Sequence, residues 1–406
     1  MQGTGESGWK GRPLIQRRGA WLWLLITLFA LGAVTPLCAQ DAEHAYFAGV
    51  AYTSDAADIS KAFPYISSSL SGDGAKQLDQ SLHQQITEQK LPLDIVFDQL
   101  GTTREARQAT ALALAIDRES TSVDQIGASY KVRIEIDAQA LFFNFKKKQI
   151  LGGYPFTLEY IDTLTSSPST AYIQSLYRNL IFGGTGRPSL VSQFVATIQH
   201  AHVPSAAARH LRVTRVVFAP KARQYIQTVA PDANLDVIKG QIAQQFGEYL
   251  AADQDVSLLP YASNQALGGA MPARFVEGSA YDLKIPPADY DIAITIDGFK
   301  KIVHSKDTVS TVYIYGAFAT LSVKEPLSGH VYFSQAMRQG AAKVVPVTEG
   351  TVNDWAASYE TLLVLLNNFA KSISTPDASW VRSAMPGSND AQSQLHALKE
   401  LIQSCR

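Results

Sequence analysis

Three histidines lie close enough in the sequence to suggest a metal site. His200, His202 and His210 form the pattern H-x-H-x7-H, and imidazole nitrogen is a common zinc ligand. They follow an expected helix and flank Pro204. A surface segment at such a position commonly carries polar residues that bind no metal. A metal site further needs groups that orient its ligands, which spacing alone does not reveal. We favour a polar surface segment and predict no metal and no cofactor.

A glycine-rich, basic segment, FGGTGRPS, occupies residues 182–189 and could contact phosphate. It lacks the Lys-Ser/Thr pair of a phosphate-binding loop, and it does not connect a strand to a helix. We therefore predict that it ends one helix and links two domains.

The sequence predicts no catalytic residue. It contains no G-x-S-x-G motif, although a triad assembled from distant residues stays open. Asp137 and Asp297 recur in similar strands. Each is expected at the end of its strand, where Asp commonly bonds to the backbone of a turn, so we interpret both as structural.

Two further segments have a binding and a structural interpretation. Residues 146–148 are three consecutive lysines at an expected hairpin turn, either solvated or in contact with an anionic partner or headgroup. One face of an expected C-terminal helix carries Leu395, Leu398 and Ile402. We favour docking of this face on the same chain over docking on another protein. Cys405 is expected on a mobile tail.

The elements that would position these residues recur at an offset of 160 positions. ASYKVRIEID at 128–137 matches ADYDIAITID at 288–297, and LHQQITE at 82–88 matches IAQQFGE at 242–248. Two apolar helix stripes follow the same offset: Leu78, Leu82, Ile86 and Ile238, Ile242, Phe246. A repeat this long predicts two tandem homologous domains, with Tyr130 equivalent to Tyr290.

The N-terminus has the layout of a secretory signal peptide. Lys10, Arg12, Arg17 and Arg18 precede an apolar run at 20–37. We predict cleavage near Ala39; the alternative is an uncleaved anchor, for which the run is short. Leu37 before Cys38 disfavours lipidation, since that processing requires a small residue there.

Composition narrows the function classes. Removing the four basic residues and one acidic residue of the leader leaves 31 basic and 35 acidic residues, a net charge of −4. This argues against general affinity for nucleic acid. The single remaining cysteine allows no internal disulfide, so the fold must rest on its core.

Each half predicts a similar order of elements. The first has strands at 45–53 and 93–100, helices at 75–89 and 104–116, a hairpin from Tyr130 to 161, and a helix at 170–182. The second has a strand at 211–219, a helix at 235–250 capped by Asn234, a strand VSLLPY, a strand at 290–296, a hairpin turning at KEPLSG, and a closing helix after Asp354. Residues 298–311 are extra, as an exposed loop or additional hairpin.

This order of strands and helices resembles the α/β domain of the curli-secretion-channel family and the amino-terminal domain of the Tol-system propeller protein, over 45–183 and 210–373. The resemblance implies an α/β (α+β) fold of two tandem three-layer-like domains, each a mixed sheet with a C-terminal hairpin and packed helices. The insert at 298–311 is too short for the membrane-spanning hairpins of the curli channel. The expected organisation is a signal peptide (1–39), a first domain (40–183), a linker with a helix (184–209), a second domain (210–375) and a tail with a short amphipathic helix (376–406).

These features predict an exported, non-catalytic envelope protein, in the periplasm or at the outer envelope, that assembles with other envelope proteins or with itself. It would be associated with a secretion or surface-appendage system, with peripheral membrane contact and no nucleic-acid partner. The alternative is an exported enzyme or small-ligand binder that uses the groove between the domains. The interface is expected on exposed sheet edges or on residues 298–311, and Ser310 and Tyr313 are the positions chosen to test it.

Overall fold

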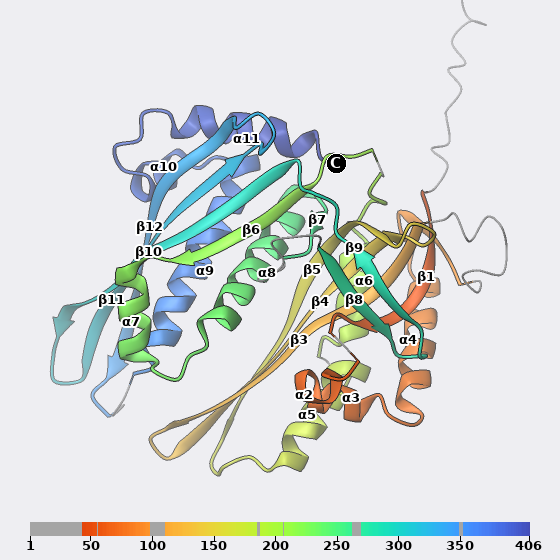
Figure 1. The fold of residues 1–406 in the computed structure, drawn as a ribbon. Coiled ribbons are helices and arrows are strands. Elements are labelled where there is room, and N and C mark those ends of the chain that lie inside the picture. Colours follow the sequence, from red (N-terminus) through yellow and green to blue (C-terminus); the bar gives the residue numbers. More distant parts are fainter. Residues whose placement is uncertain are drawn as a thin grey trace, which may run out of the picture. The chain divides into compact units, whose positions relative to one another are not determined.

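Strands from both halves of the chain join one mixed sheet in the computed structural model (Figure 1). The structure describes residues 43–54, 56–97, 110–184, 187–205, 207–261, 269–348 and 352–406. The predicted signal peptide, with Cys38 and Ala39, lies outside them. We refer to residues 43–205 as the first half and to residues 207–406 as the second half. The fold is α/β, with helices packed on a large mixed sheet, as predicted.

The first half contains five strands and five helices among its described residues. In chain order they are β1 (Glu43–Tyr52), α2 (Ile59–Ala62), α3 (Pro64–Ser69), α4 (Gly74–Glu88), β2 (Leu93–Val96), β3 (Thr110–Ile126), β4 (Ser129–Asn144), β5 (Gln149–Leu164), α5 (Thr170–Phe182) and α6 (Leu190–Ile198).

The second half continues the sheet and adds a helical C-terminal segment. Its elements are β6 (Leu211–Phe218), α7 (Pro220–Val229), α8 (Leu235–Gln254), β7 (Leu258–Leu259), β8 (Ala270–Phe275), β9 (Ala280–Lys284), β10 (Tyr290–Lys306), β11 (Ser310–Lys324), β12 (Val331–Pro346), α9 (Asp354–Ser374), α10 (Ala378–Ala384) and α11 (Ala391–Gln403).

The two halves share a strand order and polarity. β1 pairs in parallel with β2 and β3, and β3, β4 and β5 then pair antiparallel. β6 likewise pairs in parallel with β7 and β10, and β10, β11 and β12 pair antiparallel. The pairing of β5 with β7, at Gly153 and Leu258, carries the sheet from one half to the other. Ala42–Arg406 form one compact unit, and the domain boundaries stay predictions.

The helix stripes expected from the sequence face the main core. Leu78, Leu82 and Ile86 of α4 are buried, as are Ile242 and Phe246 of α8. Both helices contribute to one apolar cluster with the inner face of the sheet. The 3.6-residue period predicted these faces because buried positions recur along one side of a helix.

The predicted helix at 104–116 is wrong over its described part. Residues from Thr110 onward form β3. Ala111, Ala113 and Ala115 alternate with larger apolar residues, which is the two-residue period of a strand buried on both faces. The high helix propensity of alanine was outweighed by burial on the two faces of the sheet.

The alanine face of β3 is covered by a hairpin from the second half. β8 and β9 form that hairpin, and β8 pairs antiparallel with β1, at Ala51 and Phe275. Met271 and Phe275 pack with the alanines in a second apolar cluster on the outer face of the sheet. Small side chains let the hairpin approach closely, since a larger residue would overfill the layer.

The predicted equivalence of Tyr130 and Tyr290 is wrong. Tyr130 is the second residue of β4, which lies between β3 and β5, whereas Tyr290 begins β10, which is parallel to β6. The strand that corresponds to β10 is β3: Ile116 pairs with Tyr52 of β1 as Ile296 pairs with Phe218 of β6. The β8–β9 hairpin lengthens the second half before β10, so one constant offset could not align both the helix and the strand.

The extra residues at 298–311 do not form a separate loop. β10 continues to Lys306, and β11 begins at Ser310 after a short turn in which Asp307 accepts backbone bonds from Val309 and Ser310. The segment is therefore the outer part of the β10–β11 hairpin.

The C-terminal tail is folded onto the second half. α11 packs on β12 and α9, and Leu395, Leu398 and Ile402 are buried, so docking on the same chain is confirmed. Cys405 is only 3% exposed, and its thiol lies 3.5 Å from the carbonyl oxygen of Leu401. The prediction of a mobile tail at Cys405 is wrong because this last turn completes an apolar face.

Candidate functional site

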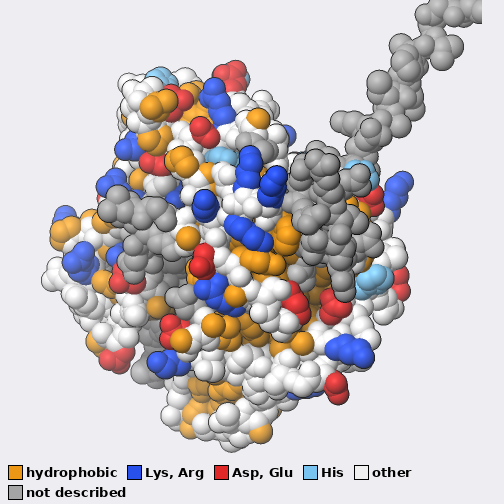
Figure 2. Space-filling view, turned by 45° about the vertical axis from the view of Figure 1, so that its right-hand side comes forward, with side chains coloured by type: hydrophobic (Ala, Val, Ile, Leu, Met, Phe, Trp, Pro, Cys, Tyr) orange, Lys and Arg blue, Asp and Glu red, His pale blue; other side chains and the backbone are white. Residues whose placement is uncertain are grey.

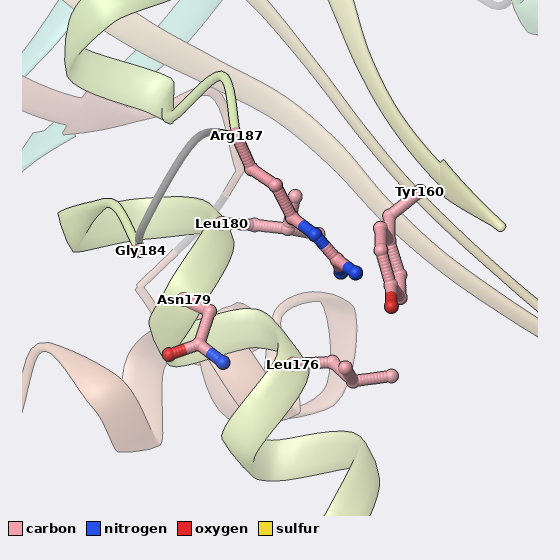
Figure 3. A pocket seen from close by; sticks show the side chains of 6 residues that line it. All are labelled: Tyr160, Leu176, Asn179, Leu180, Gly184 and Arg187. Carbon is pink, nitrogen blue, oxygen red and sulfur yellow. The ribbon is translucent and has the colours of Figure 1, made fainter. Parts of the chain in front are cut away.

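A cleft of about 390 Å³ lies beside the C-terminal end of α5 (Figure 3). It is built from one strand, one helix and the glycine-rich segment. Its lining residues are Tyr160 from β5, Leu176, Asn179 and Leu180 from α5, and Gly184 and Arg187 from the chain that follows.

Helix capping places the two sides of this cleft. The Ser169 side chain accepts the N–H of Tyr172 and starts α5. Gly183, with φ +90°, ends the helix, in a conformation that residues with a Cβ rarely adopt. The chain then returns toward β5 and brings Arg187 to Tyr160. The prediction that segment 182–189 ends a helix is confirmed.

Arg187 and Tyr160 face one another across the cleft. The guanidinium carbon lies 4.5 Å from the centre of the Tyr160 ring, a cation–π geometry, and Figure 3 shows the two groups side by side. A hydrogen bond to Tyr160 raises the pKa of Arg187. Leu176 and Leu180, both buried, supply the apolar wall behind them.

A hydrogen-bonded carboxylate holds Tyr160 in place. The Tyr160 hydroxyl donates to Asp162 at 3.2 Å, and the Tyr172 hydroxyl donates to the same oxygen. The bond from Tyr172 lowers the pKa of Asp162, and the same bond is the main reason that the pKa of Tyr172 rises to about 12. Asp162 is therefore ionised at neutral pH and Tyr172 is protonated, which keeps the aromatic side of the cleft fixed.

The chemistry of this lining suits binding. A guanidinium and a side-chain amide can donate hydrogen bonds to a carboxylate, and the ring and leucines can contact apolar atoms beside it. The six lining residues include no thiol, imidazole or carboxylate. These residues therefore supply no nucleophile paired with a general base.

The three histidines do not form a metal site. His200 and His202 are exposed, and His210 is half-buried. Burial lowers the pKa of His210, whose backbone N–H donates to Asp289. Within the described parts of the chain, no group of three or more His, Cys, Asp or Glu side chains could hold a metal ion.

Asp137 lies inside β4 and not at a strand end, so the predicted turn bond is wrong. It accepts hydrogen bonds from Arg118 Nε at 2.8 Å and from Thr157 at 3.2 Å. Arg118 also pairs with Glu135. Burial raises the pKa of Asp137, opposed by Arg118. Each charge of this ion cluster therefore meets an opposite charge inside the protein.

The second half contacts this ion cluster through α8. Gln245 donates to Thr157 at 2.6 Å, and Gln241 donates to Glu135 at 3.4 Å. Glu248, one turn further along, has its pKa raised to about 7, mainly by burial. Polar groups thus join β4 and β5 of the first half to α8 of the second.

Asp117 is a functional-looking residue that sequence reasoning missed. It lies half-buried in β3, and burial raises its pKa to about 7. Gln139 and Thr53 donate to its carboxylate at 2.8 and 2.9 Å. The signal in the sequence is an acidic residue placed directly after an alternating apolar run at 111–116, a run that the sequence alone predicts as a helix.

A shallow groove between the halves contains Glu248. It has a volume of about 360 Å³ and is lined by β5, α6 and α8, with His200 at its edge. This is the described counterpart of the expected interdomain groove, and its lining is mainly apolar around one titratable carboxyl.

The lysine cluster at 146–148 is only partly solvated. Lys146 and Lys147 are exposed, whereas the ammonium group of Lys148 lies 3.8 Å from the ring centre of Phe145 and 3.3 Å from that of Tyr281. Burial lowers the pKa of Lys148. Figure 2 shows basic side chains gathered beside apolar ones near the centre of one face of the molecule.

Of the two positions chosen to test the interface, neither is a free surface group. Both the backbone N–H and the side chain of Ser310 bond to Asp307. The Tyr313 ring lies 4.2 Å from the ammonium group of Lys301, on the helix-covered side of its strand. Substitutions there would disturb the hairpin itself.

No helix in the described part of the chain combines the length and the apolar character needed to cross a membrane. No family model and no curated protein matches the sequence.

Three solved structures are similar to part of this chain, and each is covered over at least 90% of its own length. A Xanthomonas campestris protein of the family DUF330 is 12% identical over 44% of this chain and 90% of that chain, with a TM-score of 0.20. A minor lipoprotein from Acinetobacter baumannii is 10% identical over 42% of this chain and 90% of that chain, with a TM-score of 0.20. A neuraminyllactose-binding hemagglutinin homolog from Helicobacter pylori is 12% identical over 43% of this chain and 93% of that chain, with a TM-score of 0.21. The resemblance to the curli channel and to the Tol propeller protein stays a prediction.

Proposed function

We propose that this chain is an exported, non-catalytic component of the bacterial cell envelope, and that it acts by binding a carboxylate-bearing group of a partner in the Arg187 cleft. The N-terminal layout of basic and apolar residues supports export. The observation that carries the binding function is the pairing of Arg187 with Tyr160 over an apolar wall.

The cleft matches a carboxylate attached to an apolar group. Arginine is suited to planar carboxylates because its guanidinium presents parallel N–H donors. Asn179, exposed on α5, offers a further donor. The leucines would contact aliphatic atoms, as in pockets where a few polar groups orient a mostly apolar ligand. A free C-terminal residue of a protein or peptide has this chemistry.

The test uses N-acetyl-leucine and N-acetyl-leucine amide as probes, titrated into the purified chain and followed by two-dimensional NMR. The acid is expected to shift resonances of α5, and the amide is expected to bind at least about tenfold more weakly because it lacks the charge. Arg187→Gln should abolish the difference between the probes.

The matched control is Arg178→Gln. Arg178 is exposed on the same helix and lies over Phe182, but it does not line the cleft. This variant should bind like the unchanged protein. Equal binding of acid and amide, or normal binding by Arg187→Gln, would overturn the proposal.

A second candidate function is an exported enzyme or small-ligand binder that uses the groove between the halves. The observation that favours it is Glu248, a carboxyl whose pKa of about 7 suits proton transfer near neutral pH. A small-molecule library screened by NMR should then shift His200 at the groove edge, and Glu248→Gln should abolish binding. Unshifted His200 across the library would argue against this function.

A further inference from the structure

The outer part of the β10–β12 sheet has one covered face and one open face. We define the outer ribbon as residues 298–306, 310–318 and 338–346. On its covered face, Lys301 and Tyr315 both donate to Asp354 of α9 at 2.6 Å. On the open face lies a groove of about 430 Å³, lined in part by Lys300, Ile314 and Arg338.

Two facing glycines form the floor of this groove. Gly316 of β11 and Gly340 of β12 are direct register partners. Neither has a positive φ, so their backbone conformation does not call for glycine. A Cβ on Gly340 would come no closer than 3.8 Å to another atom, and one on Gly316 would meet the Phe318 ring at 3.4 Å. Packing within the chain does not call for glycine either.

Glycine is unfavourable inside a strand, and one explanation for its use there is close approach by another molecule. The surrounding surface is apolar and open. Ile302 is 43% exposed and Val344 is 61% exposed, and Phe318 borders the glycine floor. An exposed apolar surface of this kind marks a site of interaction.

Charge identifies the class of partner. Of the five Lys and Arg residues of the outer ribbon, Lys300 and Arg338 line the groove, whereas Lys301 and Lys343 lie on the covered face. Two acidic residues lie between its strands in the sequence: Asp307 in the β10–β11 turn and Glu325 in the β11–β12 connection. The Nε of Arg338 donates to the backbone carbonyl of Ser383 at 3.2 Å, which holds its positive charge beside the groove. Together with Lys300 it favours a partner with acidic side chains at this face.

The first half shows what this side of the sheet can accommodate. There the same side of the sheet is covered over residues 111–115 by the β8–β9 hairpin, whose Met271 and Phe275 pack against the alanines of β3. Extended chain carrying apolar side chains over small residues is therefore already used once in this fold.

We propose that the outer ribbon binds an extended acidic segment of a partner protein, with an apolar side chain over Gly316 and Gly340 and carboxylates at Lys300 and Arg338. This surface shares no lining residue with the Arg187 cleft. An experiment can therefore reject the binding of acidic segments by the outer ribbon without rejecting the binding of carboxylates by the cleft.

The probe is a short fluorescein-labelled peptide in which Asp and Phe alternate, and its counterpart has Lys in place of Asp. Fluorescence anisotropy with the full chain should show binding of the acidic peptide, weakened by salt. Gly340→Val should lower its affinity at least about tenfold by filling the floor, while thermal stability holds or rises because valine favours strands. Arg338→Glu should also lower the affinity.

Lys343→Glu is the matched control, since Lys343 is exposed on the same strand but alternates to the covered side. It should leave peptide affinity nearly unchanged. Equal binding of the two peptides, binding of neither, or unchanged binding by a folded Gly340→Val variant would overturn the proposal. If sedimentation shows a dimer that Gly340→Val dissociates, a second copy of this chain occupies the groove and the partner class is wrong.

Discussion

Asp117 and Asp297 occupy equivalent β-bulges in the two halves of the sheet. Each follows an isoleucine that pairs with the preceding parallel strand, and each is the extra residue where the antiparallel register shifts. The side chain of each accepts a hydrogen bond at 2.8 Å from the next strand, Asp117 from Gln139 and Asp297 from Thr320. A bulge re-aims side chains locally, and here it turns a polar residue toward the neighbouring strand twice.

The two bulges predict unequal costs of substitution. Both aspartates are half-buried, but Asp117 accepts bonds from the side chains of Gln139 and Thr53, whereas Asp297 accepts one from Thr320. Asp117→Ala leaves the Gln139 amide without its acceptor and should lower the free energy of unfolding by about 2–4 kcal/mol; Asp297→Ala should cost about 1 kcal/mol. Urea denaturation of both variants measures the difference, and equal costs would contradict this account of the bulges.

Stability should fall as the pH rises from about 4 to about 7. Burial raises the pKa of Asp117 and of Glu248 to about 7, above the values near 4 of the unfolded chain. In this window the folded protein holds protons that the unfolded chain has lost. The stabilisation is therefore complete below pH about 4 and is lost as the pH rises through about 7.

Denaturation at pH 5 and pH 8 tests this sign. The free energy of unfolding should be lower at pH 8 by on the order of 1–3 kcal/mol. Glu248→Gln should reduce the dependence, because the amide does not titrate. A protein that is more stable at pH 8 than at pH 5 would contradict the prediction.

Removing Arg118 should be strongly destabilising. Its guanidinium pairs with Asp137 and Glu135, whose side chains are 3% and 7% exposed. Arg118→Met leaves these carboxylates without that partner, with an expected loss of about 3–5 kcal/mol. Lys239→Met is the control, because the Lys239–Asp236 pair is solvent-accessible and should contribute less than about 1 kcal/mol. Similar losses in both variants would show that the buried pair has no special role.

The C-terminal segment should protect the edge of the sheet. Gln394 of α11 accepts the backbone N–H of Ser334 in β12, and Asp390 accepts the side-chain amide of Gln335. Ending the chain after Asn389 should expose this edge strand and the apolar surface beside it, which favours self-association. Light scattering should show oligomers that the full chain does not form; a monodisperse truncated monomer would refute this.

The thiol of Cys405 offers an independent measure of the same packing. Burial raises the pKa of its thiol to about 11, so reaction with a thiol reagent should be slow in the folded protein and fast in denaturant. Rapid labelling of the native chain would indicate that α11 detaches readily.

Several local features could be predicted from the sequence. The α4 and α8 stripes, the Asn234 cap and the glycine that ends α5 all follow from interactions within a few residues of each other. Only one side of the Arg187 cleft could be predicted from the sequence. The segment FGGTGRPS indicates that the chain reverses after a helix, but nothing in it indicates that Tyr160 faces Arg187.

The sequence by itself determined the α/β class, the apolar faces of the helices and the hairpin turns, since each depends on local spacing and propensity. Tertiary structure alone decided that 110–116 is a strand, that Asp117 is the counterpart of Asp297, and that Cys405 is buried. Those outcomes depend on contacts between distant segments. The β8–β9 hairpin makes an alanine-rich strand favourable by covering its outer face, and α11 buries the last turn against β12. A short run of apolar residues such as 111–116 fits a buried strand and a buried helix alike, so only the remote segments that cover it decide between them.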